Sequence, residues 1–202
     1  ASFLDVWSNT GLDAVTPEPP PVYTEATGGI ISDYTDPGPG NVYRAHIFTS
    51  SGTFDVTQVG AIPGGTGGVD VLLVGGGGGG APYGGGGGGG AVVHVQETPI
   101  SIGPQAIVVA AGGVGGYTPV PVPAARDGGQ STVLGYTATG GGGAGGYLTP
   151  SSGSPARAGA NGGGQGAYYG PPGTPQGVAG TAPTQPGPLS PFSTVYAGNT
   201  GG

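Results

Sequence analysis

The chain contains no cysteine, methionine or lysine and little charge of either sign. Without cysteine, neither a disulfide framework nor a thiolate metal site can stabilise the fold. The three arginines (Arg44, Arg126 and Arg157) are scattered along the sequence and form no basic track for a phosphate backbone. We therefore expect no nucleic-acid partner.

Large apolar residues are also scarce, since Leu, Ile, Val and Phe number 38 of 202, near the lower limit for a conventional core. No apolar run approaches the roughly 18 residues of a membrane-spanning helix. The first ten residues carry Asp5 where a secretion signal would be basic and then apolar. With Ala1 typical of the residue left after removal of an initiator Met, we expect synthesis in a cytoplasm without a signal peptide and no membrane insertion.

Glycine and proline are abundant instead, with 52 and 22 residues. Both interrupt regular helices, so helical and ordinary α/β folds are poor candidates. Charge-driven disorder is a weak explanation, because the chain has only three basic and ten acidic residues. We predict an all-β fold with non-regular glycine-rich structure and almost no α-helix.

Composition divides the chain into an arm, residues 1–41, and a β/polyglycine-rich body, residues 42–202. The arm holds six of the ten acids, several prolines and a turn-rich DPGPG at 36–40, and it is predicted to be extended. A Trp on a poorly packed arm can bury a large area against a partner, or it can pack on the chain's own sheet. The candidate anchoring residues at the start of the arm are Phe3, Leu4, Val6 and Trp7.

Strand patterns begin the body. VYRAHIFT (42–49) and TFDVTQV (53–59) are joined by SSG, with Gly52 at a position suited to positive φ, which predicts a hairpin. In the second strand, Phe54 and Val56 should face one side, and Asp55 and Thr57 the other. VDVLLV (69–74) is continuously apolar and predicts a strand buried on both faces.

Glycine tracts follow this strand, first at Gly75–Gly80 and Gly84–Gly90. Fixing a residue costs roughly 1–2 kcal/mol, so ordered tracts need compensating interactions. Free tracts would be flexible linkers. We favour packed polyglycine-II helices of the PPII type, left-handed with three residues per turn, whose main chains approach closely enough for N–H···O=C bonds. Collagen is excluded because glycine does not recur at every third position.

Catalysis and cofactor binding are not expected. The strand entering six glycines resembles the start of a nucleotide-binding unit, but no amphipathic helix follows, and a chain without lysine cannot contain a phosphate-binding Gly-Lys-Ser/Thr motif. His46 and His94 each sit singly in an alternating strand, where imidazoles are usually surface residues. No nucleophile is paired with a base. We expect no enzyme, cofactor or metal site.

Tyrosines mark the connections between glycine tracts. Exposed tyrosines on rigid turns are common at recognition surfaces, including surfaces that bind sugars. The alternative is that their rings cap the ends of the glycine helices. The candidate residues for receptor contact or capping are Tyr83, Tyr117, Tyr147, Tyr168 and Tyr169.

The segments HIFTSSGTFDV (46–56), VDVLLVGGGGGG (69–80) and IVVAAGGVGG (107–116) resemble the glycine-rich domain of bacteriophage virion proteins of the tail-fibre, tail-tip and adhesin types. YTDPGPGNVYRAHIFTSSGTF (34–54) is most similar to versions in phages of marine cyanobacteria. The resemblance covers residues 34–202 and implies a structural or adhesive role on the virion surface.

This resemblance implies a homo-oligomeric fibre or adhesin-like component that docks on capsid or tail proteins by its arm and contacts a host glycan or outer-membrane protein through its body. A purely structural decoration or filament-forming protein is the alternative. An ice-binding bundle would require a regular flat Thr or Ala face, which the irregular repeat does not provide.

Overall fold

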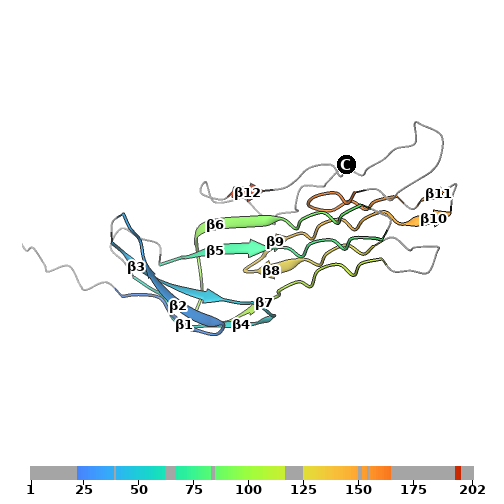
Figure 1. The fold of residues 1–202 in the computed structure, drawn as a ribbon. Helices are drawn as coiled ribbons and strands as arrows, with labels where there is room; N and C mark the ends of the chain where they lie inside the picture. The colour runs from blue at the N-terminus through green and yellow to red at the C-terminus, as the bar shows by residue number, and fades with distance from the viewer. Residues whose placement is uncertain are drawn as a thin grey trace, which may run out of the picture.

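The computed structural model describes residues 22–38, 40–61, 67–82, 85–116, 125–149, 152–153, 155–164 and 194–196. Within these ranges every regular element is a β-strand and no helix occurs, which confirms the predicted all-β fold class. Strands β1 to β9, within residues 25–138, lie towards one side of the molecule, and non-regular glycine-rich main chain continues several of them to the other side, where β10 (Tyr147–Thr149) and β11 (Ser152–Gly153) lie (Figure 1).

The strands are short, and all of their pairings are antiparallel. They form three-stranded sheets of order β1-β4-β7 and β12-β6-β5, and the hairpins β2-β3, β8-β9 and β10-β11. Their bounds are β1 Glu25–Thr27, β2 Ile30–Thr35, β3 Val42–Ile47, β4 Gly52–Gln58, β5 Val69–Val74, β6 Val92–Thr98, β7 Gly103–Ile107, β8 Ser131–Val133, β9 Tyr136–Ala138, β10 Tyr147–Thr149, β11 Ser152–Gly153 and β12 Thr194–Tyr196.

A small apolar core forms where β5 and β6 pack against β8 and β9. We call it the strand core; its buried members are Val71, Leu73, Ala91, Val93, Val95, Val133, Ala138 and Ala160. The prediction that residues 69–74 are buried on both faces is wrong, because Leu72 and Val74 are 68% and 54% exposed. Among the described strands, β5 pairs only with β6 and packs by one face, so its side chains alternate between core and solvent. The predicted alternation in β4 is confirmed, with Val56 buried and its two neighbours exposed.

The predicted hairpin between residues 42–49 and 53–59 is also wrong. β3 pairs instead with β2 over six residue pairs, from Ile30 opposite Ile47 to Thr35 opposite Val42. The DPGPG turn sets this register, because Asp36 accepts from the Gly38 amide (2.9 Å) through its side chain and donates its own amide to the Asn41 carbonyl (2.8 Å).

β4 belongs to another sheet, between β1 and β7. The chain crosses between the two sheets at residues 48–51, and Gly52 does not take the positive φ that a hairpin loop would require. The proposed arm–body boundary at residue 41 falls in the β2-β3 turn. The described part of the arm therefore pairs with strands of the body.

Six glycine-rich stretches lie next to the strand core. We call them the glycine segments, and they are residues 75–80, 85–91, 111–116, 125–129, 140–146 and 155–164. Main-chain hydrogen bonds of 2.8–3.1 Å join neighbouring segments, so many of their amides are paired with another segment, unlike those of a free coil. Segment 140–146 lies in the middle, with every residue buried, and it bonds to segments 75–80, 85–91, 125–129 and 155–164.

The bonds between segments recur every three residues. Gly141 and Ala144 donate to the carbonyls of Gly76 and Gly79, each at 2.9 Å. Gly142 and Gly145 donate in the same way to Asn161 (2.8 Å) and Gly164 (2.9 Å). A main chain with three residues per turn presents its amides at this spacing. The helix type of the segments stays an interpretation, whereas the bonds between them are observed.

Close contact between main chains explains why the central segment carries no side chain except that of Ala144. A Cβ atom on any of Gly140, Gly141, Gly142 or Gly143 would overlap a carbonyl oxygen of a neighbouring segment. At the periphery, a Cβ on Gly86 would meet nothing within 4 Å. Glycine is thus required where segments touch on all sides and replaceable where they face solvent.

Candidate functional site

At one end of the glycine segments, the chain repeatedly leaves one segment and enters another. We call this the connection end. The main-chain bonds that join its residues are Gly116 N–H to Gly80 O (2.9 Å), Ala125 N–H to Ala144 O (3.0 Å), Gly145 N–H to Gly164 O (2.9 Å) and Gly164 N–H to Gly86 O (2.8 Å). β1 to β3 lie on the other side of the molecule (Figure 1).

The stretches that begin or end at this set of residues are 81–84, 117–124, 147–154 and the chain from 165 onward. Each carries at least one of the five tyrosines singled out from the sequence. Four of these, Tyr83, Tyr117, Tyr168 and Tyr169, lie outside the described residues. Tyr147 begins β10, where its main chain pairs with Gly153. Receptor contact and capping therefore both stay predictions for these residues.

The four candidate anchoring residues of the arm lie outside the described residues as well. They are Phe3, Leu4, Val6 and Trp7. The described chain begins at Val22, which forms an isolated antiparallel bridge with Ala61 and leads into β1.

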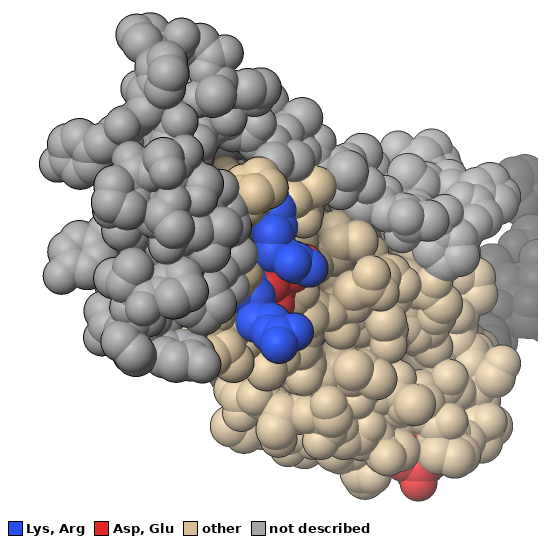
Figure 2. Space-filling view, turned by 90° about the vertical axis from the view of Figure 1, so that its right-hand side faces the viewer, with Lys and Arg blue, Asp and Glu red and all other residues tan. Residues whose placement is uncertain are grey.

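Charged side chains also gather at the connection end (Figure 2). Arg157 Nε donates to both carboxylate oxygens of Asp127, each at 2.9 Å. The Gly143 amide donates to Asp127 Oδ1 at 2.9 Å. Arg126 precedes Asp127, and its side chain is exposed. Sequence reasoning missed this cluster, because the ion pair spans 30 residues and only the packing of the segments closes that separation.

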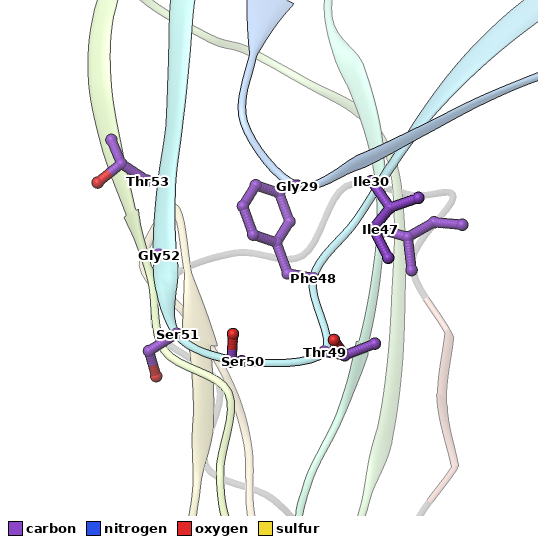
Figure 3. Close-up of a pocket in the computed structure, with 9 residues that line it drawn as sticks. All are labelled: Gly29, Ile30, Ile47, Phe48, Thr49, Ser50, Ser51, Gly52 and Thr53. Carbon is purple, nitrogen blue, oxygen red and sulfur yellow. The ribbon is translucent and has the colours of Figure 1, made fainter.

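A shallow cavity of about 220 Å³ lies on the strand side, between the base of the β2-β3 hairpin and the start of β4. Its lining residues are Gly29, Ile30, Ile47, Phe48, Thr49, Ser50, Ser51, Gly52 and Thr53. Figure 3 shows the Phe48 ring between Gly29 and Gly52. None of the described residues that line this cavity has a titratable side chain, and Ser51 Oγ already accepts a hydrogen bond from the Val109 amide (3.0 Å). These residues therefore provide no acid–base pair.

The two histidines are strand residues. His46 Nδ1 lies 2.7 Å from the Gly28 carbonyl, which can only accept, so Nδ1 carries the proton. Its ring makes an edge contact with Phe54 at 4.9 Å between centroids. His94 lies opposite Leu72 in the β5-β6 pair. Among the described residues, no three His, Asp or Glu side chains form a group that could hold a metal ion.

The β2-β3 hairpin exposes large apolar side chains on one face. We call this the apolar hairpin face; it consists of the cross-strand pairs Ile30–Ile47, Ser32–Ala45 and Tyr34–Tyr43. The two tyrosine rings stack with centroids 5.4 Å apart, and they are 55% and 42% exposed. Its isoleucines are 61% and 46% exposed. A two-stranded sheet with both faces exposed is only marginally stable by itself. An exposed apolar face on such a sheet is therefore suited to association with a partner.

The other face of the hairpin carries an exposed ion pair. Arg44 donates from Nε to Asp33 Oδ1 (2.8 Å) and from its terminal nitrogen to Oδ2 (3.0 Å). These two hydrogen bonds lower the pKa of Asp33 and raise the pKa of Arg44. This face, which we call the charged face, carries the ion pair between the exposed side chains of Ile31 and Val42.

No helix that could span a membrane occurs in the part of the chain that the structure describes. Searches of the curated proteins and of the solved structures each find no match to this chain. A family model described as a glycine-rich domain matches residues 49–202, which include all six glycine segments. The chain therefore belongs to the glycine-rich domain family.

Proposed function

We propose that the protein is a non-enzymatic structural component of a phage virion, a fibre or adhesin-like protein displayed on the virion surface. In this proposal, the arm docks on a capsid or tail protein, and the glycine-rich body faces the host. The observation that supports it best is the gathering at one end of all the segment termini that flank the tyrosine-bearing stretches. Such an arrangement suits presentation of several contacts in one direction.

The glycine segments supply a rigid support for such contacts. Each segment is bonded by its main chain to neighbouring segments, so the residues at the connection end keep fixed relative positions. Tyrosines on fixed turns give a large contact area at low entropic cost. Several weak contacts, repeated over many copies on one particle, then raise the overall avidity for a host glycan or outer-membrane protein without a deep pocket.

A second copy of this chain is the proposed occupant of the apolar hairpin face. The face is almost the same on its two strands, with an isoleucine pair, a small pair and a tyrosine pair, so it can meet its own copy about a two-fold axis. A stable interface buries about 800 Å² per partner, more than these side chains offer, so the contact must extend to neighbouring residues.

Immunogold electron microscopy tests the virion assignment directly. Antibodies raised against the purified full-length protein should label the surface of phage particles that encode it, at a constant position on each particle. Absence of the protein from purified particles, or labelling only after particles are opened, contradicts the proposal.

A purely structural decoration or filament protein is the second candidate, favoured by the extensive main-chain bonding of the body. Competition separates the two. Excess purified protein should slow adsorption of phage to host cells if the body binds the host. Unchanged adsorption, with surface labelling retained, favours the purely structural role.

A further inference from the structure

We infer that Arg126 and Arg157 form a binding site at the connection end for an oxyanion, the carboxylate or phosphate of an acidic saccharide. The oxyanion site stands on the geometry of the described residues. Its assignment to a saccharide of the host surface rests on the proposed function.

Both arginines extend from main chain that is fixed on two sides. The Arg126 amide donates to Val114, and its carbonyl accepts from Gly79, each at 2.9 Å. The Arg157 amide donates to Gly143 (2.9 Å), and its carbonyl accepts from Gly163 (3.0 Å). Binding would therefore cost little main-chain ordering.

Gly143 brings the two arginines together. Its carbonyl accepts from the Arg157 amide, and a Cβ on Gly143 would lie 2.8 Å from the carbonyl carbon of Arg126. The two arginines thus lie on separate segments that both contact one residue of the central segment. Figure 2 shows basic side chains gathered around acidic atoms on this face.

Asp127 acts as a positioning residue. It contacts Arg157 through Nε alone, which orients the guanidinium and leaves its two terminal amino groups outside that contact. Those groups form the planar fork that recognises carboxylate and phosphate oxygens. Asp127 balances one of the two positive charges, so the two arginines and this aspartate together carry a formal net charge of +1.

The net charge of −7 repels an anion, so binding here depends on a local excess of positive charge. The remaining basic residue, Arg44, is paired with Asp33 in the hairpin. Apart from Asp127, the acids in the described ranges lie in the strands and in the β2-β3 turn, at Glu25, Asp33, Asp36, Asp55, Asp70 and Glu97. The connection end is therefore the part of the described surface where a negative group meets an unbalanced positive charge.

The test uses the full-length protein immobilised at high density and three soluble polysaccharides of similar length, one carrying carboxylates, one carrying phosphates and one neutral. We expect binding of one or both anionic polymers, weakening at high salt, and no binding of the neutral polymer. Binding of the carboxylate polymer alone, of the phosphate polymer alone or of both supports the site, and the pattern identifies which oxyanion the site takes. Equal binding to the neutral polymer, or no binding to either anionic polymer, overturns the inference.

Three variants assign any binding to these residues. Arg126→Gln should weaken it about fivefold, a typical effect for one exposed charge pair, and a variant that also carries Arg157→Gln should abolish it. Arg44→Gln, at the other side of the molecule, is the matched control and should bind as the unaltered protein does. Equal binding by all variants overturns the inference. Circular dichroism confirms that each variant is folded, and the result is independent of the labelling of particles, which tests the proposed function.

Discussion

The strand core excludes water with packed apolar side chains, whereas the glycine segments exclude it with closely packed main chain. In the strand core, side chains such as Val93 and Val95 are fully buried between sheets, as in most proteins. In segment 140–146, seven consecutive residues are buried and Ala144 carries the only side chain among them. Main-chain amides and carbonyls fill the space that apolar groups occupy elsewhere. The comparison shows that the two regions should fail for opposite reasons, one when atoms are removed and the other when atoms are added.

The largest expected effect comes from adding one methyl group inside the glycine segments. In Gly141→Ala, the new Cβ overlaps the carbonyl oxygen of Gly88, and neither main chain can move without breaking bonds to further segments. We expect a loss of about 4 kcal/mol or more, or failure to fold. Thermal unfolding monitored by circular dichroism measures the effect.

Gly86→Ala is the matched control for this substitution. A Cβ at Gly86 meets nothing within 4 Å and Gly86 has no positive φ, so the same chemical change should leave stability within about 0.5 kcal/mol. If Gly141→Ala and Gly86→Ala unfold at the same temperature, the segments are not packed as described.

Removing atoms from the strand core should have the next largest effect. Leu73 is 6% exposed and Leu72, its neighbour in β5, is 68% exposed. Leu73→Ala should cost about 3 kcal/mol, because it leaves a cavity among packed side chains. Leu72→Ala should change the free energy of unfolding little. Chemical denaturation of both variants checks the contrast, and equal losses would mean that β5 is covered on both faces, as its apolar sequence had suggested.

These comparisons also show what the sequence could and could not predict. The alternation in residues 53–59 and the need for bonding between glycine tracts follow from local patterns and from the chemistry of glycine. The pairing partner of β3 cannot be predicted in this way. The turn at Asp36 and the shorter link at 50–52 could each place a strand beside β3, and the turn at Asp36 does so, with six residue pairs. The pairing of Arg157 with Asp127 is invisible as well, since it depends on which segments lie next to segment 140–146.

The β2-β3 hairpin belongs neither to the strand core nor to the glycine segments. Substitutions on it should therefore change self-association of the protein more than its folding. Tyr34→Ser removes one ring of the stacked pair on the apolar hairpin face and should weaken self-association about tenfold. Val42→Ser, on the charged face and 71% exposed, is the control. Sedimentation velocity over a range of concentrations compares them. A monomer at all concentrations in the unaltered protein, or equal weakening by both substitutions, contradicts the proposed interface.

The ion pair on the other face of the hairpin should give the smallest effect, visible mainly through its pH dependence. Because Arg44 lowers the pKa of Asp33 below its usual value of 3.8, the carboxylate form stabilises the fold at neutral pH. This contribution is lost as the pH falls through the lowered pKa. Asp33→Asn should therefore destabilise the protein slightly at pH 7 and by less at pH 3, because the contribution of the carboxylate declines as the pH falls below the usual value of 3.8. Melting temperatures at both pH values measure it, and a larger loss in acid would show that the pair acts in the opposite direction.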